Sequence, residues 1–267
     1  MTIDYRSQTV LLTGASAGIG AAFATALASR GANLVLVARR ADQLTAIADE
    51  LHRTHGVRVD TIPFDLADPA AGAALHRIVT ERGIAITSVI NNEAVGTFAL
   101  FADADAGRLA TEIAVDVAAP VQVTAAFLPD LLRAGNGFIL NVAGASAYVP
   151  SPRMAVYSAA KAFVLSFTES LWAELRGSGL TVFAVSPGAT RTEFTTGMGT
   201  GARVLISGKT RAADDVVATA LAHLERRNPG PSVVDGRINR LTVMMSRFAT
   251  RRQSAALMAR VLDPARL

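Results

Sequence analysis

Tyr157 and Lys161 lie four residues apart in AVYSAAKAFV, a stretch rich in good helix formers. Residues at this spacing share one face of a helix. An ammonium group beside a phenol favours the phenolate and so lowers the pKa of the phenol. Such a group can exchange a proton with a carbonyl or alcohol oxygen near neutral pH. The chain has only three Tyr and two Lys, so the pair is a specific signal. We predict that Tyr157 is an acid/base and that Lys161 assists it.

A glycine-rich turn near the N-terminus indicates a second kind of chemistry. Residues Thr9–Thr13 read as a short buried strand, and Gly14-Ala-Ser-Ala-Gly18-Ile19-Gly20 and a helical run follow. Glycines let a backbone approach a pyrophosphate closely, and a helix N-terminus favours its negative charge. The order of strand, turn and helix therefore predicts dinucleotide binding at Gly14, Gly18, Ile19 and Gly20.

Short apolar runs alternate with helical stretches along the chain, which predicts an α/β fold: a single doubly wound parallel sheet with helices on both faces. The expected strands are Thr9–Thr13, Asn33–Ala38, Arg58–Phe64, Ser88–Asn91, Gly137–Val142, Thr181–Ser186 and Ser232–Val234. The expected helices are Ile19–Arg30, Ala41–His55, Pro69–Glu81, Asp105–Arg133, Met154–Gly177 and Ala213–Arg226. The Gly- and Thr-rich segment Thr192–Lys209 is expected to be a lid, or else a disordered surface loop.

Composition excludes several classes of protein. At 267 residues with 51% apolar and 18% charged residues, the chain suits one well-buried domain. It has no Cys, and its four His show no metal-ligand spacing, so we expect no disulfide and no metal. It has no basic run with interleaved aromatics, no targeting segment and no long apolar run. We therefore expect a cytoplasmic protein that binds no nucleic acid and is not integral to a membrane.

The C-terminal segment differs from the rest of the chain. Residues 236–267 contain seven Arg but only one acid, Asp263, with apolar residues between them. We predict a cofactor-binding and catalytic domain over residues 1–235 and a basic amphipathic extension over 236–267. We expect this extension to pack on the domain or on a second subunit; the alternative is a helix that contacts a membrane surface or an acyl chain.

Taken together, these motifs resemble the classical short-chain dehydrogenase/reductase family, in its NADP-preferring branch. The resemblance covers about residues 7–235 and rests on Thr13-Gly14-x-x-x-Gly18-Ile19-Gly20, Asn91-Asn92, Tyr157-x-x-x-Lys161 and Pro187-Gly188-x-Thr190-x-Thr192. It implies a Rossmann-like fold and a nicotinamide cofactor. Lys161 would bind the nicotinamide ribose and lower the pKa of Tyr157. The other implied cofactor contacts are Asp65 and Leu66 at the adenine, Asn91 at the adenosine ribose, and Pro187, Gly188, Thr190 and Thr192 at the carboxamide.

The choice of cofactor follows from the end of the second expected strand. Ala38 is followed by Arg39 and Arg40, and no acid precedes Asp42. An acid there would accept from the ribose 2′-hydroxyl of NAD, whereas a 2′-phosphate requires Arg. Ser16 adds a hydroxyl. We therefore predict NADP(H), against the alternative that both Arg only begin a solvated helix.

Three departures from the family pattern lie where the active centre would assemble. The family's Ser, thirteen residues before the catalytic Tyr, is Gly144, and Ser146 substitutes for it only if the loop is reshaped. The family's Asn in the long central helix is Asp116, which adds a negative charge near Lys161 and weakens its effect on Tyr157. The usual Asn-Asn-Ala-Gly ends in Glu93-Ala94.

Three functions fit this mixture. The first is an NADP(H)-dependent oxidoreductase that interconverts a ketone and a secondary alcohol, with Tyr157, Lys161, Asp116 and Ser146 at its catalytic centre. The second is a non-redox cyclase, isomerase, dehydratase or lyase on the same scaffold. The third is a catalytically silent partner subunit. The expected substrate is a hydrophobic carbonyl or acyl compound, because the expected wall residues are small or apolar. The family resemblance implies a homodimer or homotetramer that pairs through the two long helices, expected here at Asp105–Arg133 and Met154–Gly177.

Overall fold

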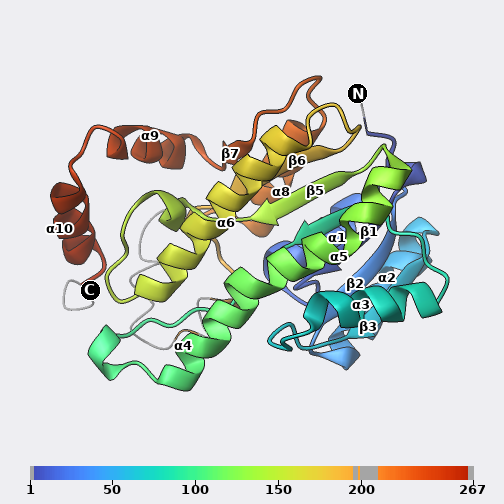
Figure 1. Ribbon diagram of the computed structural model, residues 1–267, viewed down its shortest axis with the longest axis horizontal. Coiled ribbons are helices and arrows are strands. Elements are labelled where there is room, and N and C mark those ends of the chain that lie inside the picture. The colour runs from blue at the N-terminus through green and yellow to red at the C-terminus, as the bar shows by residue number, and fades with distance from the viewer. Residues whose placement is uncertain (1–2, 195–197, 199–209, 264–267) are drawn as a thin grey trace.

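Seven strands of the computed structural model form one parallel sheet in the order β3-β2-β1-β4-β5-β6-β7 (Figure 1). The structure describes residues 3–194, 198 and 210–263. The strands are β1 Thr9–Thr13, β2 Asn33–Ala38, β3 Val59–Pro63, β4 Ser88–Asn91, β5 Phe138–Val142, β6 Thr181–Ser186 and β7 Ser232–Val234. The strand order reverses between β1 and β4, which places the carboxyl ends of both strands at a crevice. The predicted single doubly wound parallel sheet is confirmed.

Helices cover both faces of the sheet. One face carries α1 (Gly18–Ala28), α2 (Ala41–His55) and α8 (Ala213–Leu224), whose apolar residues pack with those of β1, β2, β5 and β6 in one core cluster. On the other face, α3 (Ala71–Glu81) and α5 (Ala119–Ala134) join a second cluster with α6 (Ala155–Glu174), and α5 and α6 cross in front of the sheet in Figure 1. The five inner strands are almost completely buried, as their continuous apolar runs predict, whereas the edge strands β3 and β7 are mostly half-buried.

The long helix expected over Asp105–Arg133 is interrupted at its centre. An α-helical part, α4 (Ala106–Ile113), leads into a π-helical turn over Ala114–Ala118, and α5 (Ala119–Ala134) follows. By length and composition alone, residues Ala106–Ala134 could cross a membrane. Phe127 and Leu131 of this segment are fully buried in the second core cluster, as expected of a core helix.

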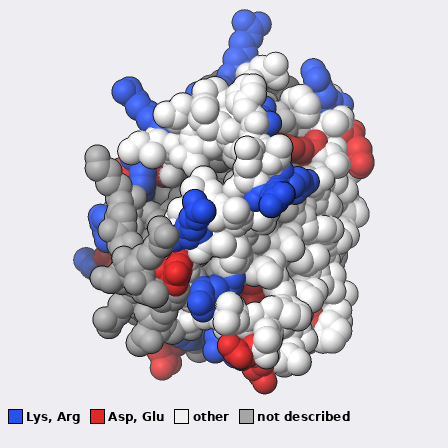
Figure 2. Space-filling view, turned by 90° about the vertical axis from the view of Figure 1, so that its left-hand side faces the viewer, with Lys and Arg blue, Asp and Glu red and all other residues white. Residues whose placement is uncertain are grey.

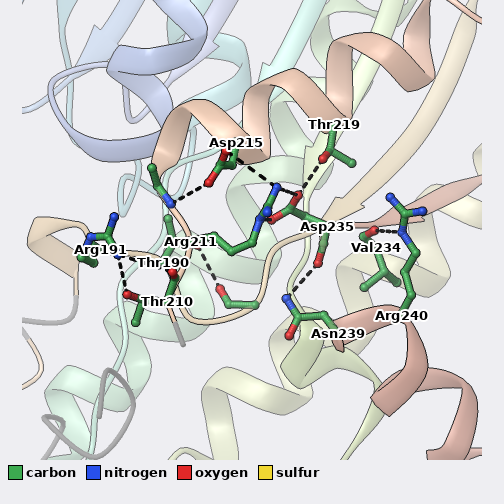
Figure 3. A network of polar contacts seen from close by, with 12 residues as sticks. Thr190, Arg191, Thr210, Arg211, Asp215, Thr219, Val234, Asp235, Asn239 and Arg240 are labelled. Carbon is green, nitrogen blue, oxygen red and sulfur yellow. Dashed lines mark hydrogen bonds and ion pairs between the residues drawn. The ribbon is translucent and has the colours of Figure 1, made fainter. Parts of the chain in front are cut away.

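The C-terminal extension forms two helices, α9 (Arg237–Ser246) and α10 (Arg251–Val261), at the left of Figure 1. A buried polar network holds its beginning (Figure 3). The carboxylate of Asp235, which is completely buried, accepts from Arg211 at 2.8 and 3.0 Å and from the Thr219 hydroxyl at 2.6 Å. The backbone carbonyl of Asp235 accepts from the Asn239 side chain at 2.8 Å. The first turn of α9 is therefore tied to the end of β7.

Most of the predicted lid, Thr192–Lys209, lies outside the described residues. Of the described part, Phe194 and Met198 join Met154, Phe98 and Tyr157 in a small apolar cluster.

Candidate active site

Hydrogen bonds from the loop after β4 fix the conformation of the glycine-rich turn after β1. The Asn92 side chain donates to the backbone carbonyls of Thr13 and Gly14 at 3.0 and 3.2 Å. The Thr13 hydroxyl accepts from the backbone N–H groups of Asn92 and Glu93 at 2.9 and 3.1 Å. Gly14 has φ of +65°, and a Cβ on Gly20 would collide with the Gly14 carbonyl. The glycines therefore keep the turn tight and bare at the N-terminus of α1, as a pyrophosphate site requires.

The basic residues after β2 lie beside this turn. The Arg40 guanidinium donates to the Ser16 hydroxyl at 3.1 Å and forms a 2.9 Å ion pair with Glu193. Arg39, Arg40 and Ser16 all line one cavity. A phosphate bound there would meet two guanidinium groups and a hydroxyl, which is the donor set that a 2′-phosphate needs.

Tyr157 and Lys161 lie on the first turns of α6, at the other end of the same cavity. The Lys161 Nζ lies 5.4 Å from the centre of the Tyr157 ring and donates to the Val142 carbonyl at 3.4 Å. It also forms a buried ion pair with Asp116, 3.5 Å from Oδ2. The structure therefore brings Asp116 to Lys161, as the sequence predicts.

The electrostatics of Tyr157 correct one expectation. Burial raises the pKa of Tyr157, and the negative charges of Asp116 and Glu112 raise this pKa further. The net shift is therefore opposite to the lowering expected from Lys161, whose ammonium pairs with the Asp116 carboxylate. The phenol of the protein itself is therefore protonated at neutral pH, which suits it to donate a proton.

The π-helical turn explains how Asp116 reaches this position. The extra residue in the turn leaves Asp116 fully buried, where its Oδ1 accepts from the Val95 N–H at 2.9 Å. Burial raises the pKa of Asp116, while Lys161 and the Val95 N–H lower it. Glu112, one turn earlier, is 1% exposed, and within the described part of the chain neither of its carboxylate oxygens has a hydrogen bond of good geometry. Burial raises the pKa of Glu112 more than the nearby Thr97 groups lower it.

Gly144 and Ser146 form a reshaped loop after β5. Gly144 has φ of 153° and ψ of 158°, a combination open to glycine almost alone. A Cβ placed on Gly144 would lie 3.2 Å from the Ser146 Oγ. The Ser146 hydroxyl thus lies beside the place from which a serine at residue 144 would extend, and both residues line the cavity with Tyr157.

The Glu93 side chain is not turned out into solvent. It lines the cavity and is only partly exposed. Burial raises the pKa of Glu93, and Arg39 opposes this rise. The Glu93 carboxyl group therefore lies at the cavity and not on the outer surface.

One large cavity of about 750 Å³ joins most of the predicted residues. Those that line it are Gly14, Ser16, Gly18, Ile19, Arg39, Arg40, Ser146, Tyr157, Lys161, Pro187, Gly188, Thr190 and Thr192. Gly20 and Asp65 are not among the lining residues, and Asp65 accepts from the Ala67 N–H.

Two predicted contacts face the core instead. Leu66 is buried in the second core cluster. The Asn91 side chain, also buried, donates to Thr124 and Asn141 at 3.1 and 2.8 Å. The Asn91 side chain is thus turned away from the large cavity, which Asn92 lines instead, and cofactor contacts at Leu66 and Asn91 stay predictions.

Comparison with known proteins agrees with this geometry. Residues 8–202 match the family described as short chain dehydrogenase. The chain belongs to the short-chain dehydrogenase family. It is 33% identical over 254 residues to sulfoacetaldehyde reductase 2 of Chromohalobacter salexigens, covering 91% of this chain and 96% of that protein.

Solved structures of other short-chain dehydrogenases resemble it over most of their length. One from Sphingobium yanoikuyae, in complex with NADPH, has a TM-score of 0.80 and 33% identity, covering 90% of this chain and 93% of that one. The bulky-bulky ketone specific alcohol dehydrogenase from Comamonas testosteroni has a TM-score of 0.76 and 28% identity, covering 91% and 93%.

This short-chain dehydrogenase also has site residues that the motifs did not identify. Asn239, Thr242 and Val243 of α9, with Met258 and Leu262 from the end of the chain, line the cavity. A Cβ on Gly188 would collide with the Asn239 side chain, so α9 packs directly on the Pro187–Gly188 turn. No motif marks these residues; only the alternation of apolar and Arg residues in the extension hinted that one of its faces is covered.

Proposed function

We propose that the protein is an NADP(H)-dependent oxidoreductase that interconverts a ketone and a secondary alcohol on a hydrophobic substrate. The observation that carries this proposal is the shared cavity, which has Arg39 and Arg40 at one end and Tyr157, Lys161 and Ser146 at the other. Two relatives support it by name, one a reductase and the other a dehydrogenase in complex with NADPH, each 33% identical to this chain.

The residues fit the cofactor. The bare turn from Gly14 to Gly20 would hold the pyrophosphate, and Arg39, Arg40 and Ser16 would hold a 2′-phosphate. Lys161 would bind the nicotinamide ribose, and the Pro187–Thr192 turn the carboxamide. When bound, the nicotinamide would supply or accept the hydride. Asp65 stays a predicted adenine contact, since its side chain is exposed at the end of β3.

The side chains of the chain itself would handle the proton and the charge. In reduction, the Tyr157 hydroxyl donates its proton to the carbonyl oxygen as an alcohol forms there. The Ser146 hydroxyl donates a hydrogen bond to the same oxygen and stabilises its developing negative charge. Because its pKa is raised, Tyr157 is protonated at neutral pH and carries the proton that reduction needs. Asp116 holds Lys161 in place.

The substrate wall supports a hydrophobic carbonyl compound. Near Tyr157 the cavity is lined by apolar side chains: Val95, Val149, Met154, Phe194, Val243, Met258 and Leu262. The Phe194 ring lies 5.3 Å from the Tyr157 ring, so a flat or aliphatic group would pack between apolar surfaces beside the acid/base. A ketone with two bulky apolar substituents suits this space better than a small charged keto acid.

The test combines binding and turnover. NADPH and NADH are titrated by energy transfer from Trp172, the only Trp of the chain, and NADPH oxidation is followed with a panel of ketones. We expect NADPH to bind at least tenfold more tightly than NADH, and Arg39→Ala to remove most of that preference, because a charged hydrogen bond contributes about 1.5–3 kcal/mol. Arg53→Ala, on the exposed part of α2, is the matched control. Equal binding of both nucleotides in the wild type would overturn the proposed preference.

One observation favours a second candidate. Glu93 places a carboxyl group with a raised pKa in the cavity, where a non-redox lyase or isomerase would need a proton donor. Product formation without change in the nicotinamide would select this candidate. A silent partner subunit would bind NADPH but turn over no ketone, and would be purified with a related chain. We further propose a homodimer or homotetramer in the cytoplasm, without nucleic-acid partners.

A further inference from the structure

The outer face of α9 is apolar and exposed. Four large side chains on it, Ile238, Leu241, Met244 and Met245, are between 51% and 62% exposed, and Phe248, in the turn just after the helix, is 80% exposed. At 100° per residue they fall on one continuous stripe, because they follow the i, i+3, i+4 and i+7 spacing of a helix face. A stripe this large is more than the scattered apolar residues of an ordinary surface.

The inner face of the same helix is already occupied. Val243 is 8% exposed and lines the large cavity, as do Asn239 and Thr242. The outer stripe therefore has no role in packing α9 on the domain. The helix is a thin wall with the cavity on one side and its exposed apolar stripe on the other.

Arginines surround this stripe. Arg237, Arg240 and Arg247 lie on α9 or just after it, and Arg251, Arg252 and Arg260 lie on α10. In the described part of the chain none of these six forms a salt bridge; Arg240 donates to the Val234 carbonyl. In Figure 2, which views the molecule from the side of α9 and α10, several basic side chains project from the upper and middle parts of the surface, with a smaller number of acidic ones between and below them.

This charge argues against a second copy of the chain as the occupant. Two copies meeting face to face would bring Arg against Arg, with Asp263 the one acid in the described part of the extension, and like charges in an interface are unfavourable. An exposed apolar stripe bordered by Arg is instead what a helix needs to lie in the headgroup region of an anionic bilayer. The network around Asp235 fixes the first turn of α9, so the face is presented in an ordered form (Figure 3).

We propose that α9 and α10 form a docking face for an anionic phospholipid bilayer, with the apolar stripe of α9 inserted among the headgroups and the arginines on lipid phosphates. The cavity wall would then lie against the membrane. Delivery of a lipid-dissolved carbonyl substrate to the cavity would follow only if the proposed function is correct. Docking to the bilayer does not depend on that function.

The experiment is co-sedimentation of the purified full chain with phosphatidylcholine vesicles, with and without phosphatidylserine. We expect binding only to the vesicles that contain phosphatidylserine, and release by high salt. Arg251→Glu with Arg252→Glu should weaken binding about 30-fold or more, since each basic residue near the surface contributes about 1 kcal/mol. This pair should fold, because acids are favourable at the first turn of a helix. Arg53→Glu with Arg227→Glu changes the net charge equally on other exposed surfaces and should leave binding nearly intact.

Three outcomes would overturn the proposal: no binding to either vesicle, equal loss in the tail and control variants, or a tail variant that only dissociates an oligomer. The last would make the face a subunit interface. Leu241→Ser with Phe248→Ser tests the stripe separately and should also weaken binding to phosphatidylserine vesicles. Because sedimentation needs no turnover, failure of docking leaves the proposed reaction standing, and absence of reductase activity leaves the docking standing.

Discussion

At the scale of single residues, the site keeps its Tyr–Lys pair but rebuilds what surrounds it. The Gly144 backbone takes a conformation that a side chain rarely adopts, and this places Ser146 beside the missing serine position. Asp116 forms an ion pair with Lys161 and raises the pKa of Tyr157. The departures from the family pattern are therefore coupled to one another through the geometry of the site.

Ser146 is predicted to be the donor to the substrate oxygen. Ser146→Ala should lower kcat by about 10²–10³-fold, as the loss of one oxyanion donor does in other enzymes. The measurement is steady-state NADPH oxidation with the best ketone. An undiminished kcat would exclude this role.

Gly144→Ser provides a complementary test. A side chain at φ of 153° is strained, and its Cβ would lie 3.2 Å from the Ser146 Oγ. We expect the variant to lose stability by about 1–3 kcal/mol and to gain no activity. Chemical denaturation measures the first and turnover the second. A faster enzyme of unchanged stability would mean that the loop adopts a family-like shape.

Asp116 should set the pH dependence of the reaction. Alcohol oxidation requires the Tyr157 phenolate, so its rate rises as pH rises through the pKa of Tyr157. Asp116→Asn removes a charge that raises this pKa, and the profile should therefore move to lower pH. Asp214→Asn, on the exposed start of α8, should not move it. A profile that stays in place or moves to higher pH would contradict the assignment.

At the scale of elements, the π-helical turn positions Asp116, and the glycine-rich turn after β1 positions the backbone that would contact the cofactor. The sequence located the long helix and identified Asp116, but neither periodicity nor composition revealed the extra residue in the turn. The same limit applies to Asn91 and Asn92, because the motif names both but only the structure decides which one faces the cavity. Local patterns determine where elements lie along the chain, whereas the direction of each side chain depends on partners distant in sequence.

Glu112 should reduce stability at neutral pH. Its pKa is raised in the folded protein, so as pH rises the unfolded state loses this proton first, and the folded state is disfavoured above the ordinary pKa of a Glu. Glu112→Gln removes the charge and should raise the free energy of unfolding by about 1 kcal/mol at neutral pH, with little effect near pH ~4. Denaturation at both pH values checks this. A loss of stability at neutral pH would show that Glu112 has a favourable partner.

Gly20→Ala tests the packing of the glycine turn. The new methyl would collide with the Gly14 carbonyl and lie 2.7 Å from the Asn92 amide nitrogen. We expect a loss of about 1–3 kcal/mol in stability and weaker NADPH binding. Gly230→Ala is the control, since a Cβ there meets nothing within 4 Å. If both variants bind NADPH like the wild type, the turn is looser than described.

At the scale of the whole molecule, the sheet, its parallel order and the helices on both faces followed from the alternation of strands and helices. The cavity wall built by α9 and α10 did not, because the amphipathic pattern of the extension is compatible with packing on the domain, on a subunit or on a membrane. In the structure Val243 and Leu262 close the cavity while Phe248 stays exposed. The extension thus has one side packed on the domain and another side exposed, whereas the sequence analysis treated packing on the domain and contact with a membrane as alternatives.

Pairing through the long helices is a separate prediction. Ile113, Leu132 and Phe163 are exposed apolar residues on α4, α5 and α6. A dimer or tetramer would bury such residues. Phe163→Glu should therefore shift the protein toward the monomer in sedimentation equilibrium, while Leu241→Glu on α9 should not. The reverse result would place the subunit interface on the extension.

The central claim, hydride transfer with Tyr157 as proton donor, is tested most directly with NADPH that carries deuterium at both positions on C4 of the nicotinamide, so that transfer from either face delivers the label. The product of a hydrophobic ketone is examined by mass spectrometry, with the wild type and Tyr157→Phe. The account predicts deuterium on the carbinol carbon with the wild type and at least a hundredfold less product with the variant. Product without deuterium, or equal product from Tyr157→Phe, would contradict it.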